Sequence, residues 1–169
     1  MKKIVTILTS IILFSCAKQE TETQFSETAL AEKVIQLNGG ETTLKAVFNK
    51  YKGKTVVVDV WASWCSDCLA GLPKVKELQA QTKENENLVY LFLSVDRKQN
   101  AWENAIVKRN IIGEHYFLPL GMKESIFGEN IVLDWIPRYM VIGKDGEIKL
   151  FKAIKATDSK ILAAIKADR

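Results

Sequence analysis

Two cysteines three positions apart are the residues of this sequence whose spacing points most directly to chemistry. Cys65 and Cys68 lie in the segment WASWCSDC, residues 61–68, and a third cysteine, Cys16, stands far upstream. A CxxC pair can bind a metal, staple a fold or exchange electrons with other thiols. The role of Cys16 decides which cysteines remain available for a site.

Metal binding needs more ligands than the pair provides. Zinc takes about four, commonly two such pairs or one pair with histidines, whereas the chain has one pair and a single histidine, His115. A purely structural disulfide remains an alternative, although closing so short a loop constrains the unfolded chain little. The pair therefore favours redox exchange, and we expect no metal and no cofactor.

Cys65 is the expected nucleophile because it stands where a strand gives way to a helix. TVVVDVW, residues 55–61, is a nearly continuous β-branched run typical of a central strand, and a helix is predicted to follow the pair to about Glu84. Unpaired N–H groups and the positive end of this helix favour a thiolate at Cys65. Cys68, one turn further on and more buried, would then resolve the mixed disulfide that Cys65 forms with a substrate.

An acid inside the predicted central strand supports the same interpretation. Ionised and unpaired, Asp59 would cost several kcal/mol on a strand buried on both faces, so its pKa should be raised. From below the helix, its carboxyl could relay a proton to or from Cys68. The alternative is that Asp59 caps a backbone group or reaches solvent at a sheet edge.

Taken together, these residues resemble the thioredoxin superfamily from about Val34 to the C-terminus. VVVDVWASWCSDC, residues 56–68, is similar to the family's strand and active-site motif, and Pro73 matches the proline that kinks the active-site helix. Ile136–Pro137 matches the cis-proline opposite the cysteines. The resemblance implies that Trp64, Ile136 and Pro137 bind substrate. Arg138 would contact substrate or cap the surface.

The start of the chain indicates export. MKKIVTILTSIILFSC has two lysines and then an apolar run of about 11 residues, which is the layout of a signal peptide and too short to span a membrane. LFSC resembles a bacterial lipobox, which implies that Cys16 carries a lipid anchor; an ordinary signal peptide is the alternative. We expect a signal over residues 1–15, a flexible tether over 16–31 and one domain over 32–169.

Along that domain, predicted strands alternate with predicted helices. Apolar runs at 55–61 and 88–95 are each followed by a helical pattern, which implies a largely parallel sheet. After Pro137, two apolar runs joined by Gly143–Gly146 predict an antiparallel hairpin, and a helix should occupy 159–167. The fold class is thus α/β, a thioredoxin fold with a central mixed sheet flanked by helices on both faces. An extra segment separates the second central strand from the cis-proline.

The lipoprotein signal and the extra segment resemble the TlpA/ResA-like branch of membrane-anchored oxidoreductases. This resemblance implies a protein-disulfide reductase facing the periplasm. Its substrates would be exported proteins with disulfides, such as apocytochromes during cytochrome c maturation, and its electrons would come from an upstream membrane donor. Ser66–Asp67 and Gly71 depart from the common pattern of that branch. A carboxylate at Asp67 disfavours the thiolate and therefore favours a reductase.

Other functions fit the sequence less well. A copper-handling protein of similar fold usually separates its cysteines by three residues, and a thiol peroxidase needs a separate peroxidatic cysteine; a thiol oxidase or isomerase remains an alternative. Lys and Arg number 24 against 20 Asp and Glu, a net charge of +4 that falls to +2 without Lys2 and Lys3. Because these charges are interspersed, no nucleic-acid partner is expected.

Overall fold

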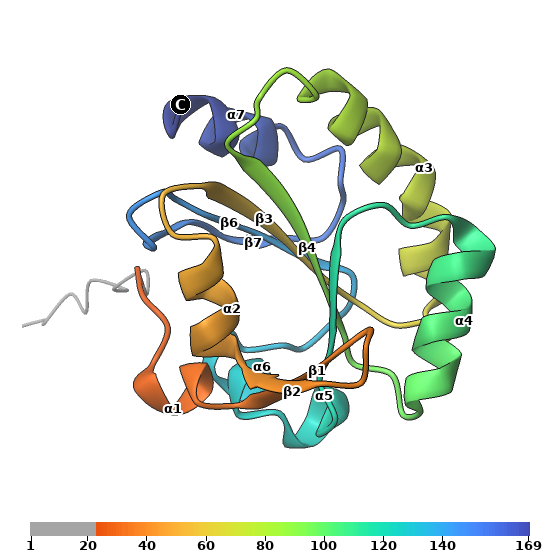
Figure 1. Cartoon of the computed structure of the whole chain (residues 1–169). Helices are drawn as coiled ribbons and strands as arrows, with labels where there is room; N and C mark the ends of the chain where they lie inside the picture. The colour runs from red at the N-terminus through yellow and green to blue at the C-terminus, as the bar shows by residue number, and fades with distance from the viewer. Residues whose placement is uncertain (1–22) are drawn as a thin grey trace, which may run out of the picture.

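A seven-stranded mixed sheet runs through the centre of the computed structural model, which describes residues 23–169 (Figure 1). The strands are ordered β2-β1-β5-β4-β3-β6-β7, with β4 parallel to β3 and β5, and β6 antiparallel to β3. Their bounds are β1 Lys33–Gln36, β2 Glu41–Thr43, β3 Thr55–Trp61, β4 Leu88–Ser94, β5 Glu114–Phe117, β6 Arg138–Ile142 and β7 Ile148–Ala153. The predicted fold class is confirmed.

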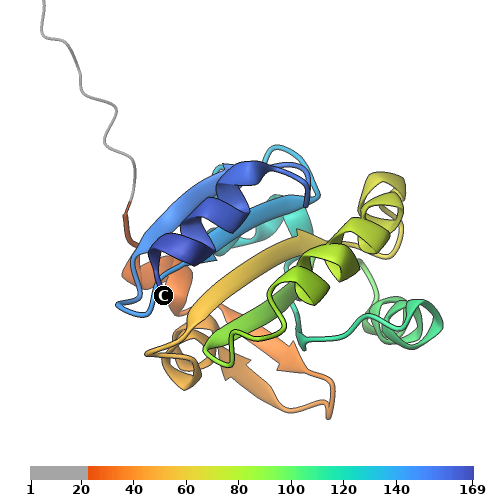
Figure 2. The ribbon, with the colours of Figure 1, turned by 90° about the horizontal axis from the view of Figure 1, so that it is seen from above.

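Helices cover both faces of this sheet. Their bounds are α1 Glu27–Leu30, α2 Leu44–Lys50, α3 Ser66–Gln81, α4 Gln99–Arg109, α5 Gly121–Glu124, α6 Ile126–Asn130 and α7 Ser159–Ala167. Figure 2 shows α3 and α7 over the near face of the sheet, with α1 and α2 behind it. Among the helices of residues 23–169, none has the length and apolar character that crossing a membrane requires.

The central strand β3 is buried along its whole length, as its composition predicts. It pairs with β4 on one side and β6 on the other, so both of its backbone edges are satisfied. Side chains alternate between the two faces of a strand, so Thr55, Asp59 and Trp61 share one face. Thr55 donates a hydrogen bond of 2.6 Å to Asp168, which follows α7. The Asp59 side of the sheet is therefore the side that α7 covers.

The predicted elements recur with small changes at their ends. The helix after the cysteines ends at Gln81 rather than near Glu84, because the Thr82 hydroxyl donates to the Leu78 carbonyl at 2.9 Å and closes the last turn. The extra segment predicted before the cis-proline contains two short helices, α5 and α6. Ser125 separates them, and its hydroxyl caps α6 by accepting from the Gly128 N–H at 2.8 Å.

The boundary of the predicted tether needs a correction. Residues 16–22 lie outside the described part of the chain, but residues 25–31 pack against the domain instead of extending from it. The Phe25 ring lies 5.1 Å from that of Phe48 and 5.3 Å from that of Phe127, and Ala29 on α1 is fully buried. The polar composition of the segment hid this, because two well-spaced apolar side chains suffice to dock a short helix on a surface that the rest of the fold provides.

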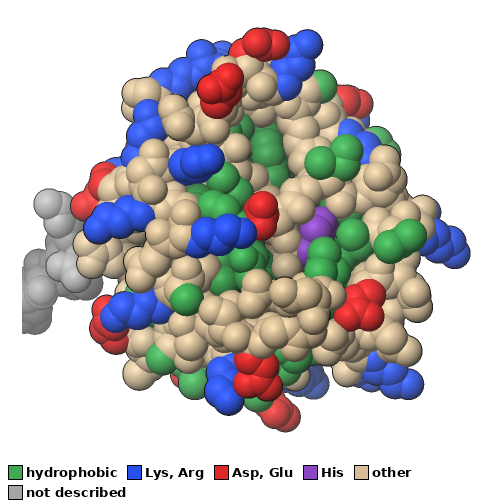
Figure 3. All heavy atoms as spheres, viewed as in Figure 1, with side chains coloured by type: hydrophobic (Ala, Val, Ile, Leu, Met, Phe, Trp, Pro, Cys, Tyr) green, Lys and Arg blue, Asp and Glu red, His purple; other side chains and the backbone are tan. Residues whose placement is uncertain are grey.

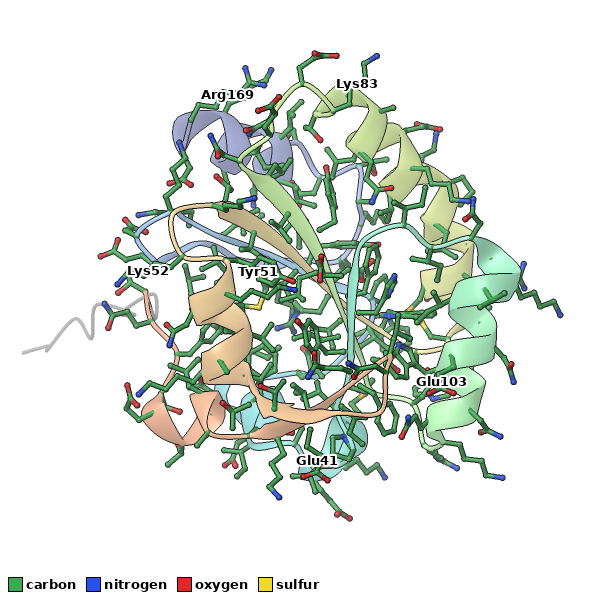
Figure 4. All side chains as sticks on the ribbon, viewed as in Figure 1. Glu41, Tyr51, Lys52, Lys83, Glu103 and Arg169 are labelled. Atoms are coloured by element: carbon green, nitrogen blue, oxygen red, sulfur yellow. A yellow bond between two sulfur atoms is a disulfide. The ribbon has the colours of Figure 1, made fainter. Side chains whose placement is uncertain are left out.

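Charged side chains of both signs are mixed over the face shown in Figure 3. The sticks of Figure 4 show the contrast between neighbours on one turn: Tyr51 points from the end of α2 toward the sheet, whereas Lys52 points outward. Tyr51 is buried and Lys52 is exposed. A candidate active site lies elsewhere on the molecule, around the cysteines, where large apolar side chains are exposed.

Candidate active site

The cysteine pair lies at the beginning of α3 and is joined by a disulfide. Cys65 is the N-cap of the helix, and its sulfur accepts a hydrogen bond of 3.1 Å from the Cys68 N–H. Both side chains are largely buried, Cys68 slightly more than Cys65, and their Cα atoms are 5.3 Å apart. Once the pair is reduced, this N–H and the helix end will stabilise a thiolate at Cys65.

The turn before Cys65 is held by an aspartate that the sequence pattern did not single out. Asp96 follows β4, and its carboxylate accepts from the Ser63 N–H at 2.9 Å, the Ser63 hydroxyl at 2.6 Å and the Ser94 hydroxyl at 2.8 Å. It is almost completely buried. The sequence did contain one indication of this role, an acid directly after an apolar strand. The carboxyl ends of adjacent parallel strands meet at one edge of a sheet, so such an acid lies near the end of the neighbouring strand. Asp96 thus fixes the backbone that leads into the pair.

Asp59 lies on β3, on the face of the sheet that α3 and α7 cover. Burial raises the pKa of its carboxyl from the ordinary 3.8 to about 8, and the nearby Tyr139 hydroxyl acts against this rise by hydrogen bonding. Asp59 and Tyr139 are paired residues on the adjacent strands β3 and β6. The Oδ1 atom of Asp59 is buried and has no hydrogen-bond partner among the described residues. A carboxyl with a pKa near neutrality can both accept and donate a proton at physiological pH.

The loop before β6 faces the cysteines. The Ile136–Pro137 peptide is cis, and the Ile136 carbonyl oxygen lies 3.6 Å from the Cys65 sulfur. Next to this contact is a hollow of about 320 Å³. It is lined by Trp64, Cys65, Ser66, Asp67, Met122, Asp134, Trp135 and Ile136. The indoles of Trp64 and Trp135 are 55% and 57% exposed, so two large apolar rings are open to solvent beside the disulfide.

Arg138 has neither of its expected roles, since it is completely buried and does not line the hollow. Its guanidinium donates to the carbonyls of Ile131 at 2.7 Å and Val132 at 3.0 Å, and to the Asp134 carboxylate at 2.6 Å. Arg138 therefore ties down the segment that leads to Trp135. The sequence did not indicate this role for Arg138. Arginine is mostly an exposed residue, and it is buried only where acceptors are available for its donors.

Three further positions were singled out in the sequence: Cys16, Pro73 and His115. Cys16 lies outside the described residues. Pro73 lies within α3 and is exposed. His115 is buried, with its Nε2 3.0 Å from the Ile111 carbonyl and its ring stacked on Phe92, so it packs within the core. Within residues 23–169, no group of three or more His, Cys, Asp or Glu side chains is placed to hold a metal ion.

Comparison with known proteins agrees with this geometry. The family model described as thioredoxin-like matches residues 53–148, which include the central strand, both cysteines and the cis-proline. The thioredoxin domain of a thiol-disulfide oxidoreductase from Bacteroides vulgatus shares the fold, with a TM-score of 0.66 and 23% identity over 81% of this chain and 92% of that one. The chain belongs to the thioredoxin-like family.

Two curated relatives match by sequence. A probable nucleoredoxin 1 from Arabidopsis thaliana is 26% identical over 132 residues, which are 77% of this chain and 22% of that protein. A thioredoxin from Echinococcus granulosus is 36% identical over 73 residues, 43% of this chain and 62% of the relative. The chain spans less than two thirds of the length of each of these relatives. Family, fold and CxxC disulfide together define the class as a thioredoxin-like protein with a CxxC pair, as predicted.

Proposed function

We propose that this protein reduces disulfides of exported proteins, through a cycle in which Cys65 and Cys68 alternate between dithiol and disulfide. The observation that carries the proposal is the placement of the pair: a helix N-cap cysteine is bonded to a second cysteine, on a helix that covers the same face of the sheet as α7, the face on which a buried carboxyl has a pKa of about 8. A nucleophile, a resolving thiol and a proton acceptor are thereby assembled at one end of α3.

The cycle begins with the reduced protein. The Cys65 thiolate attacks one sulfur of the substrate disulfide, which forms a mixed disulfide and releases the other substrate sulfur as a thiolate. The Asp59 carboxylate then takes the proton of the Cys68 thiol, and the resulting thiolate attacks Cys65. The second substrate thiol leaves, so the substrate has gained two electrons and the pair is a disulfide. An upstream electron donor returns the pair to the dithiol.

The surface around the pair supports a protein substrate. The exposed rings of Trp64 and Trp135 both line the hollow, as do Cys65 and Ile136, whose carbonyl oxygen lies 3.6 Å from the Cys65 sulfur. Exposed aromatic surface of this kind is typical of an interaction site. An extended segment with apolar side chains next to its cysteine would cover both rings while its sulfur meets Cys65. Apocytochrome cysteines are one such substrate.

The proposed location is the envelope of a bacterium, with a lipid on Cys16 anchoring the protein to a membrane and the domain facing the periplasm. Its support is the sequence of residues 1–16. Replacement of Cys16 by serine in the full chain should release the protein from the membrane fraction. Membrane retention equal to that of the native chain would contradict the anchor and leave the redox cycle untouched.

Trapping tests the redox function directly. In Cys68→Ser, the mixed disulfide cannot be resolved, so partners should accumulate covalently on Cys65 and be released by a reductant. Mass spectrometry then identifies them, including any apocytochrome. The matched control, Cys65→Ser with Cys68 intact, should trap far less because it lacks the N-cap thiolate. Equal trapping by both variants, or no insulin-reducing activity in the native protein, would overturn the proposal.

A further inference from the structure

A buried tyrosine lies beside the buried acid on the strand opposite. Tyr139 is the direct partner of Asp59 across the antiparallel pair of β3 and β6, and paired residues project to the same face of a sheet. Tyr139 is 2% exposed. The Tyr139 hydroxyl lowers the pKa of the Asp59 carboxyl and so opposes the effect of burial on it. Asp59 therefore has one polar neighbour within its own sheet on the side that α3 covers.

The tyrosine also reaches the edge of a second hollow. Tyr139 lines a space of about 350 Å³ beside α3, together with Gly71, Lys74, Pro137 and Lys155. Gly71 on α3 lies beside its hydroxyl: a Cβ added there would lie 3.5 Å from the hydroxyl oxygen. Because glycine has no side chain, α3 leaves space beside this buried hydroxyl at the edge of the hollow. A tyrosine thus stands between a carboxyl buried under the helix and a space open to solvent.

We propose that Tyr139 is the positioning residue of the proton relay, holding the Asp59 carboxylate by a hydrogen bond and linking it to solvent through the gap at Gly71. This inference rests on the role of Asp59 in the proposed redox cycle. The Cys68 thiol loses its proton to the Asp59 carboxylate, and the neutral carboxyl then has to return that proton to water. Tyr139 accepts it while giving its own hydroxyl proton to water in the hollow, so the phenol is unchanged.

Other charged or titratable groups around this pair are few. Asp67 and Lys74 line the hollow from α3, and Lys155 lines it from the segment after β7. The two cysteines of the disulfide lie on the first turn of the same helix. On β4, the residue opposite Asp59 is Phe92, and on β7 the residue opposite Tyr139 is Ala153. Arg138 belongs to the other face, where it binds Asp134. Tyr139 is therefore the group whose removal should act most directly on Asp59.

The test is the titration of the Asp59 carboxyl carbon by NMR in the oxidised protein, which needs no substrate. Tyr139→Phe removes a donor to the carboxylate and should raise the titration midpoint by about one pH unit. Tyr90→Phe is the matched control: it also removes a largely buried hydroxyl, one that bonds to Thr82 at 2.8 Å, and should leave the midpoint where it is. An unchanged midpoint in Tyr139→Phe would overturn the inference.

The gap at Gly71 is tested with two substitutions of different size. Gly71→Ala adds a Cβ in ordinary contact with the Tyr139 hydroxyl and should leave the Asp59 midpoint unchanged, whereas Gly71→Val fills the gap and should raise it. If both variants titrate like the native protein, the hollow is not the solvent path. Insulin reduction by the native protein is measured separately. If the native protein does not reduce insulin but Tyr139→Phe shifts the Asp59 midpoint, the redox function alone is refuted. If the native protein reduces insulin but Tyr139→Phe leaves the Asp59 midpoint unchanged, the role of Tyr139 alone is refuted.

Discussion

Replacing Asp59 by asparagine should make the protein more stable at high pH and remove the loss of stability that ionisation of this carboxyl causes. Asparagine has the shape of the neutral acid and cannot ionise. The carboxyl has an ordinary pKa of 3.8 and a pKa of about 8 in the folded protein. Between these values the folded state binds a proton that the unfolded state has lost, so the free energy of unfolding must fall as the pH rises.

The size of the effect follows from the two pKa values. They are about four pH units apart, and each unit is worth roughly 1.4 kcal/mol. The contribution is fully present below pH 4, where the carboxyl is neutral in both states. It is lost as the pH rises to 8, at a total cost of about 6 kcal/mol. At pH 9, Asp59→Asn should therefore exceed the native protein in stability by several kcal/mol, whereas at pH 4 the two should nearly agree.

Urea unfolding of the oxidised proteins from pH 4 to pH 9 measures this difference. Asp134→Asn is the informative control, because Lys152 holds the pKa of this exposed carboxyl below its ordinary value, so its contribution is lost as the pH falls. The two substitutions should thus change the pH dependence in opposite directions. If the native protein and Asp59→Asn lose stability in parallel up to pH 9, Asp59 is not protonated in the fold and the reasoning fails.

Three further substitutions probe the surroundings of the pair. Arg138→Met leaves the acceptors of its loop unpaired, so Trp135 should lose its position. The kcat/KM for a protein disulfide should then fall about tenfold through KM. An unchanged KM would show that the hydrogen bonds of Arg138 are not needed to position Trp135. Phe25→Ala should lower the free energy of unfolding by about 2 kcal/mol, measured in urea, since the ring stacks on the domain; no loss would restore the tether boundary. Asp67→Lys should raise the reduction potential, measured against glutathione, by about 20 mV by favouring the Cys65 thiolate, and a lower potential would refute this electrostatic argument.

The order of strands and helices could be predicted because the apolar pattern of this chain is strong. The run at residues 55–61 is β-branched and nearly continuous, and such a run is typical of a strand buried on both faces. Asp59 could be picked out for the same reason, because burying a lone acid on such a strand is costly and points to a role for its carboxyl. Patterns of this kind are local, so they can be read from the chain without knowing what packs against it.

Residues whose role depends on distant contacts could not be found in this way. Asp96 holds Ser63 across 33 positions of sequence, and Phe25 meets Phe127 far along the chain. Arg138 looked like a surface residue for another reason: its acceptors lie only four to seven positions earlier, but an irregular loop turns them toward the guanidinium. Asp96 and Phe25 each have a partner that only the completed fold brings near, and a single sequence contains no measure of that proximity.

The direction of electron flow depends on two opposing fields at one end of α3. The helix N-terminus and the Cys68 N–H stabilise a Cys65 thiolate, which favours the dithiol and makes the pair a better oxidant. The Asp67 carboxylate, in the first turn of the same helix, opposes this, but it is exposed and screened by water. Asp59 adds a third contribution only above its pKa of about 8, where its buried carboxylate disfavours a second negative charge nearby. The potential should therefore rise more in Asp59→Asn than in Asp67→Asn at pH 9, whereas at pH 6, where the Asp59 carboxyl is neutral, Asp59→Asn should leave the potential nearly unchanged.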